Sequence, residues 1–110
     1  MILYNKTKNI TVSKNLGIAD KFLSRFLGLI PRKSLNGDEG LMINRCTGVH
    51  TCFMSFDIDI VFTTADLKVI DIITLKPWRF SKFYESEYAI EFNSGFVYDK
   101  ISVGDVLSLK

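Results

Sequence analysis

Residues 58–75 read IDIVFTTADLKVIDIITL, and this stretch decides the fold class of the chain. Its first half places Ile58, Ile60 and Phe62 at every second position, which is the period of a β-strand. Residues 64–66 interrupt that pattern, and residues 67–75 are again rich in β-branched side chains. The sequence therefore predicts two long strands joined as a β-hairpin.

The flanking sequence predicts further short strands, separated by turn-forming residues. They are expected at residues 1–4, 9–13, 41–44, 88–92, 96–98 and 106–109. Residues 45–57 indicate a loop or an irregular strand, and residues 76–86 a loop opened by Pro77. So many short strands indicate a mainly β protein.

One amphipathic helix is predicted after the second strand. Its apolar face is marked by residues at three- and four-residue spacing, namely Ile18, Ala19, Phe22, Leu23, Phe26, Leu27 and Ile30. Asn15 is the expected N-cap, and Gly28 followed by Pro31 ends the helix. The predicted fold is α+β and mainly β: a curved antiparallel sheet or partial barrel with one amphipathic helix packed against it, in a single domain over residues 1–110.

Composition and charge exclude few classes of protein. The chain is 47% hydrophobic and 24% charged, as in ordinary globular proteins. It has no apolar run near the ~20 residues of a membrane span and no signal-peptide core, so we expect a cytoplasmic protein with free thiols. Residues 1–33 carry seven cations and one anion, whereas the remainder carries seven cations and eleven anions. This asymmetry indicates either a basic face for an acidic partner or ordinary solvated charge.

Several segments in order resemble the uncharacterised prokaryotic family called domain of unknown function 192. The matching segments are residues 25–29 (RFLGL), Leu35 with residues 38–41 (DEGL), residues 50–54 (HTCFM) with 58–62 (IDIVF), residues 77–78 (PW), residues 90–92 (IEF) with Gly95, and residues 104–105 (GD). The chain departs from the commonest pattern at Ile30, at residues 50–51 and at Asp57.

The resemblance implies a fold more than a function. It implies a compact β-sheet domain of half-barrel type, and it brings no established activity, cofactor or ligand. Some members are exported or attached to membranes, and the absence of a leader here argues against export of this chain.

His50 is the only histidine and titrates near neutrality without help. With Cys46 and Cys52 it forms a weak candidate metal site, in a spacing that matches no well-known zinc motif. A second hypothesis is a cysteine nucleophile activated by His50. The simplest interpretation is that the two thiols are buried and the histidine is structural. No cofactor is therefore predicted.

Carboxylates stand at interior positions of three predicted strands. Asp59, Asp71 and Glu91 each lie between apolar residues, where an unpaired charge would be costly. We expect Asp59 to face solvent, a polar cleft or a cation such as Arg25 or Arg45. If Asp59 and Glu91 share a face, they form a carboxylate pair for acid–base work or cation binding. Alternation alone also explains them, as the wet face of a one-sided sheet.

The loop at residues 76–86 is both aromatic and basic. It contains Trp78, Arg79, Phe80, Phe83 and Tyr84, with Lys76 and Lys82. Such a loop would stack unpaired bases, grip a peptide or cover the open end of the barrel. The acidic balance of this half of the chain argues against nucleic acid, and packing of the loop is the favoured interpretation.

The first functional hypothesis is a non-catalytic accessory domain that binds a small polar ligand or a protein segment. Its polar cleft would be lined by His50, Met54, Asp59, Trp78 and Glu91, with Arg25 as a further candidate. The alternative is a small hydrolase or lyase that uses Asp59 or Glu91 with His50, with or without a metal. A third is a scaffold whose exposed strand edge pairs with another chain. The sequence does not specify an oligomeric state.

Overall fold

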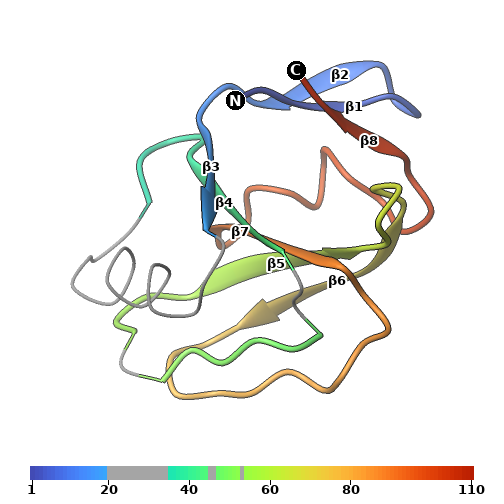
Figure 1. The fold of residues 1–110 in the computed structure, drawn as a ribbon. Helices are drawn as coiled ribbons and strands as arrows, with labels where there is room; N and C mark the ends of the chain where they lie inside the picture. Colours follow the sequence, from blue (N-terminus) through green and yellow to red (C-terminus); the bar gives the residue numbers. More distant parts are fainter. Residues whose placement is uncertain (20–34, 45–46, 53) are drawn as a thin grey trace.

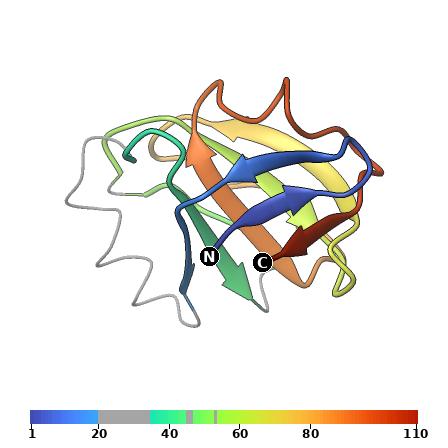
Figure 2. The same ribbon diagram turned by 90° about the horizontal axis from the view of Figure 1, so that it is seen from above.

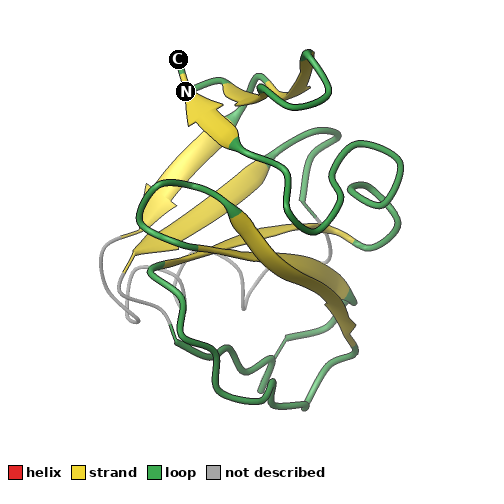
Figure 3. Cartoon of the chain, turned by 90° about the vertical axis from the view of Figure 1, so that its right-hand side faces the viewer, coloured by secondary structure: helices red, strands yellow, loops and turns green. Residues whose placement is uncertain are grey.

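A computed structural model describes residues 1–19, 35–44, 47–52 and 54–110 of the chain. These residues form two β-sheets and no helix (Figure 1, Figure 3). The strands are β1 (Leu3–Asn5), β2 (Ile10–Ser13), β3 (Leu16–Ala19), β4 (Gly40–Asn44), β5 (Ile58–Thr63), β6 (Val69–Leu75), β7 (Tyr88–Asn93) and β8 (Leu107–Leu109). The larger sheet has the order β3-β4-β7-β5-β6 and the smaller has the order β2-β1-β8. Neither sheet closes into a barrel within the described residues.

The predicted hairpin is confirmed and forms one side of the larger sheet. Strands β5 and β6 pair in antiparallel fashion from Ile58 opposite Leu75 to Thr63 opposite Val69. Strand β5 also pairs with β7 along its whole length, and all six of its residues are buried. The hairpin therefore supplies the interior strand β5 and the edge strand β6.

The sheet is mixed, which corrects the expected all-antiparallel arrangement. Strand β3 runs parallel to β4, with Leu16 opposite Gly40 and Ile18 opposite Met42. Ile18 and Ala19 had the spacing of a helix start, but parallel pairing with β4 places them in a strand. The rest of the predicted amphipathic helix lies in residues 20–34, outside the described residues. The part of the chain that the structure describes contains no helix long and apolar enough to span a bilayer.

Apolar side chains cover both faces of the larger sheet. The first core cluster lies between the two sheets and comprises Leu3, Val12, Leu16, Met42, Val61, Val69, Ile90, Phe92, Val97, Ile101 and Leu107. The smaller sheet lies over this face (Figure 2). The second cluster lies on the other face and comprises Leu35, Val49, Met54, Ile58, Ile60, Phe62 and Ala89. The protein therefore has two cores that share one sheet.

A close contact with the Phe92 ring explains why position 40 is a glycine. A Cβ atom added to Gly40 would lie 2.5 Å from the ring of Phe92, which is fully buried. No side chain fits there unless the Phe92 ring moves, so glycine at position 40 leaves room for Phe92 in the first core cluster.

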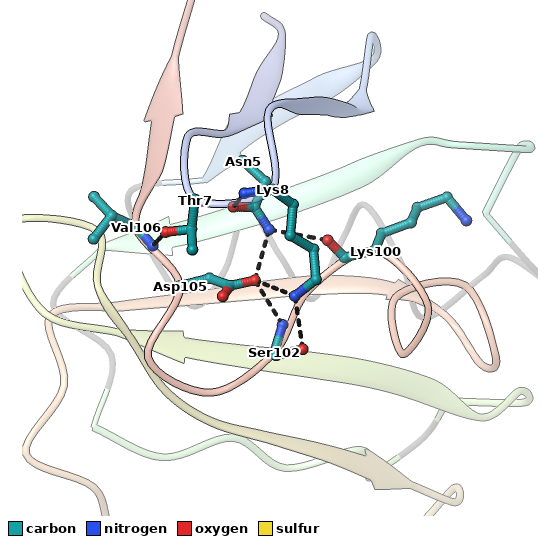
Figure 4. A network of polar contacts seen from close by, with 7 residues as sticks. All are labelled: Asn5, Thr7, Lys8, Lys100, Ser102, Asp105 and Val106. Atoms are coloured by element: carbon teal, nitrogen blue, oxygen red, sulfur yellow. Dashed lines mark hydrogen bonds and ion pairs between the residues drawn. The ribbon is translucent and has the colours of Figure 1, made fainter.

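A polar network joins the turn between β1 and β2 to the loop before β8 (Figure 4). Asp105 is 6% exposed and accepts hydrogen bonds from Asn5 Nδ2 (2.8 Å), Lys8 Nζ (2.6 Å) and the backbone nitrogen of Ser102 (2.9 Å). Burial raises the pKa of Asp105, but hydrogen bonds from Lys8, Asn5 and Ser102 outweigh it, and the net pKa is lowered. The carboxylate therefore stabilises the smaller sheet in its charged form.

Replacing Asp105 with alanine should lower the free energy of unfolding by roughly 2–3 kcal/mol, because three charge-assisted hydrogen bonds are lost. Asp99→Ala is the control, since its ion pair with Lys100 is exposed and should contribute much less to stability. Because the folded pKa of Asp105 is lowered, this stabilisation is present above about pH 4 and is lost as the pH falls through the folded value. Urea titrations at several pH values measure both effects; equal losses for the two variants would contradict the prediction.

Candidate functional site

The two carboxylates predicted to share a cleft project from opposite faces of the larger sheet. Asp59 stands opposite Phe92, and Glu91 stands opposite Ile60. Residues paired across strands share a face, and neighbours along a strand alternate between faces. Asp59 therefore lies on the face of the first core cluster and Glu91 on the face of the second. The expected carboxylate pair is not formed.

Asp59 is a fully buried acceptor that holds the segment after β7. Its Oδ1 accepts a hydrogen bond from Thr74 Oγ1 (2.8 Å), and its Oδ2 accepts from the backbone nitrogens of Gly95 (2.8 Å) and Val97 (3.5 Å). These bonds turn residues 94–98 away from the extended conformation, which corrects the strand predicted at 96–98. The arrangement is that of a structural carboxylate.

Glu91 and Met54 are buried on the opposite face. Glu91 is 0% exposed and stands between Leu41 of β4 and Ile60 of β5. Met54 is 2% exposed and belongs to the second core cluster. Of the remaining candidates, Arg25 and Cys46 lie outside the described residues.

His50 lies away from the sheet, in a short backbone ladder formed by two loops. It makes an isolated antiparallel bridge with Phe80. On one side of that bridge, the backbone nitrogen of Ser81 donates to Val49 O (2.8 Å), and that of Tyr84 donates to Thr47 O (2.7 Å). On the other side, the backbone nitrogen of Thr51 donates to Arg79 O (2.9 Å). Residues 47–51 and 76–84 therefore form one ordered unit, which we call the loop platform.

Thr51 fixes the turn of the loop platform. It is fully buried, and its hydroxyl donates to the carbonyl oxygen of Lys76 (2.6 Å) while accepting from the backbone nitrogen of Arg79 (2.9 Å). The backbone nitrogen of Trp78 donates to Thr51 O (3.0 Å). A single threonine thus holds both ends of the segment that carries the tryptophan.

The loop platform exposes three large aromatic side chains. Trp78 is 56% exposed, Phe80 is 74% exposed and Phe83 is 89% exposed. This corrects the expectation that the loop packs against the sheet, which holds only for Tyr84. Phe80 and Phe83 line a hollow of about 190 Å³ together with His50, Ser81 and residues 47–49. The His50 ring lies 5.9 Å from the Phe80 ring, centre to centre.

Among the described residues that line the hollow, His50 is the only titratable side chain. His50 Nδ1 accepts a hydrogen bond from the backbone nitrogen of Cys52 (3.3 Å), which orients the ring. Among residues 1–19, 35–44, 47–52 and 54–110, no three His, Cys, Asp or Glu side chains cluster closely enough to hold a metal ion. The sequence signal for this surface was the aromatic loop itself; nothing in it marked Thr51.

Tyr84 anchors the loop platform to the larger sheet. Its ring stacks on Phe62 with centroids 4.0 Å apart, and its hydroxyl donates to Asp71 Oδ2 (2.8 Å). Burial raises the pKa of Tyr84 to about 12, with the Asp71 hydrogen bond and charge adding to the effect. Asp71 Oδ1 also accepts from the backbone nitrogen of Ile72, on the edge strand β6. The anchor therefore also occupies part of an open sheet edge.

Comparison with known proteins places this fold among uncharacterised relatives. The model of the family DUF192, described as uncharacterized ACR, matches residues 3–109 and confirms the resemblance in sequence. The UPF0127 protein of Pyrococcus horikoshii is 36% identical over 81 residues, which cover 71% of this chain and 70% of that protein. The UPF0127 protein of Thermococcus kodakarensis is 29% identical over 113 residues, covering 97% of this chain and 72% of that protein.

Two solved structures share the fold. A protein of unknown function from Novosphingobium aromaticivorans superposes with a TM-score of 0.77 at 18% identity, covering 98% of this chain and 82% of its own. A protein from Sinorhizobium meliloti, described as a proposed transcription regulator, gives a TM-score of 0.79 at 21% identity, covering 97% of this chain and 89% of its own. At these identities the likeness shows the fold and assigns no activity.

Asp59→Asn should lower the free energy of unfolding by roughly 1.5–3 kcal/mol, because the amide can no longer accept all the hydrogen bonds that Thr74, Gly95 and Val97 donate to the carboxyl group. Thr74→Val removes one of the three hydrogen-bond donors to Asp59, at an exposed position. It should lower the free energy of unfolding by about 1 kcal/mol. Urea unfolding gives both values. A stability change below that of Thr74→Val would exclude a structural role for the Asp59 carboxylate.

Tyr84→Phe should lower the free energy of unfolding by about 0.5–1.5 kcal/mol while keeping the stacked ring. Because folding raises the pKa of Tyr84 to about 12, its contribution is complete below about pH 10 and is lost as the pH rises through 12. The variant should therefore lose less stability than the unmodified protein on alkaline titration. If the free energy of unfolding of the two proteins fell equally as the pH rises, the result would argue against the Tyr84–Asp71 hydrogen bond as an anchor.

Proposed function

This chain belongs to the family of uncharacterized ACR proteins, domain of unknown function 192, and from that premise we propose that it is a non-catalytic docking domain whose working surface is the loop platform. The single observation that carries the proposal is the exposure of Trp78, Phe80 and Phe83 on a backbone held by Thr51. Soluble domains rarely gather large apolar side chains at the surface unless that surface makes contact with something.

The size of the hollow favours a large partner over a small ligand. Pockets for small molecules usually enclose about 300–1,000 Å³, whereas the hollow beside His50 measures about 190 Å³. Most of the aromatic surface lies outside the hollow, since Phe83 is nine-tenths exposed. Contact across a surface uses all three aromatic side chains, while a small ligand would reach only two of them.

The docking hypothesis leaves distinct roles for the other candidates. His50 contributes a polar group at the edge of the surface, and Trp78 is one of its apolar contacts. Asp59 and Glu91 support the sheet beneath and are not required to touch the partner. This division separates residues that maintain the fold from residues that make contact.

Small organic probes test which part of the protein surface binds apolar molecules. In the presence of phenol or isopropanol, the largest backbone amide shifts should cluster at residues 47–50 and 80–83, because apolar probes gather where aromatic surface is exposed. Phe83→Ser should abolish the cluster, and Val103→Ser, which removes an exposed apolar side chain elsewhere, should leave it unchanged. Probe shifts centred instead on Thr74 and Tyr98, the exposed neighbours of Asp59, would refute the assignment.

A further inference from the structure

We propose that the partner of the loop platform is an anionic lipid surface, which the protein contacts peripherally through Trp78, Phe80 and Phe83. This inference rests on the proposed function and names the partner of that same surface. It requires no membrane-spanning segment, since aromatic side chains at a loop tip enter only the headgroup region of a bilayer.

The first argument is the density of exposed aromatic side chains. Six of the eight residues at positions 76–83 are exposed, and three of those six are aromatic. Tryptophan and other ring side chains favour the membrane–water interface, where one end is apolar and the other is wet. All three rings are more than half exposed and the hollow beside Phe80 and Phe83 is small, so most of their surface is available to a deformable layer.

The second argument is local charge. Three exposed cations lie beside or between the aromatic side chains, namely Lys76, Arg79 and Lys82, and residues 76–83 contain no carboxylate. These are three of only seven cations in residues 34–110, which carry eleven anions. The basic charge of this acidic half is thus concentrated where the aromatic side chains are exposed, which complements an anionic surface.

The third argument is that the loop is held in shape. The φ of Trp78 is 63°, a left-handed conformation that favours glycine, and the hydrogen bonds of Thr51 enforce it. In this conformation the Trp78 side chain is more than half exposed, so much of its ring is available to a partner. Its placement is explained by contact with something outside the chain.

These features favour lipid over a protein partner. A protein groove for a peptide offers a concave apolar slot or an open strand edge. Backbone hydrogen bonds already join residues 47–51 to residues 79–84 within the loop platform, and the hollow is small. Aromatic side chains spaced among cations need no fixed shape in the partner, only apolar depth and negative charge.

The experiment uses vesicles and the only tryptophan of the chain as the reporter. Vesicles of phosphatidylcholine alone are compared with vesicles in which about one third of the lipid is phosphatidylglycerol. Co-sedimentation measures the partition coefficient, and the fluorescence of Trp78 reports its surroundings. Binding to the anionic vesicles, with a blue shift of the emission and reduced quenching by acrylamide, is the expected result.

Variants separate the two contributions to binding. Each of Lys76→Gln, Arg79→Gln and Lys82→Gln should weaken the partition coefficient about fivefold, and the triple change about a hundredfold. Phe83→Ser should weaken it at least about tenfold. Trp78→Gly removes the ring at a position that favours glycine, so it should weaken binding while the protein stays folded. Lys6→Gln and Val103→Ser are matched controls with exposed side chains elsewhere, and they should bind like the unmodified protein.

The result that would overturn the lipid assignment is equal or absent binding to the two kinds of vesicle, with no shift of the Trp78 emission. If the organic probes still cluster on the loop platform in that case, the docking domain stands and its partner is a protein. If the probes also fail to cluster there, the proposed function falls as well. Loss of binding in Lys6→Gln equal to that in Lys82→Gln would show attraction by net charge alone and would also overturn the assignment.

Discussion

The pairing of β5 with β7 is the interaction on which the rest of the structure depends. Both strands are interior to the larger sheet, and both of their faces are covered. Successive side chains along each strand therefore enter two different cores. Val61 enters the core beneath the smaller sheet, whereas Ile60 and Phe62 enter the core beneath the loops. A shift of one residue in this register would exchange the two sets of side chains, so both cores specify the same pairing.

The same alternation explains which parts of the site the sequence could predict. The hairpin from Ile58 to Leu75 followed from a two-residue period, because that period is a local property of the chain. The relation between Asp59 and Glu91 was not local. Each residue was placed correctly on a strand, but their faces depend on which residues stand opposite each other across β5 and β7, and this register is set by tertiary packing.

Two other errors have the same physical origin, which is competition from distant partners. Residues 96–98 have β-forming side chains, yet the buried carboxylate of Asp59 takes up the backbone nitrogens of Gly95 and Val97 and bends the chain. Ile18 has the spacing of a helix face, yet its backbone pairs with β4. Local preference is a weak term, and a long-range hydrogen-bonding partner overrides it in both places.

The loop platform follows a different principle from the cores, because its backbone is ordered while its aromatic side chains are exposed. In the cores, side chains stabilise the fold by leaving water; here Thr51 and the short ladder hold the backbone, and Phe80 and Phe83 remain in water. The left-handed Trp78 adds a cost of roughly 1–2 kcal/mol relative to an ordinary conformation. The hydrogen bonds of Thr51 hold that conformation, and contact with an apolar and negatively charged surface, as proposed, would use the exposed aromatic side chains, the neighbouring cations and the ordered backbone together.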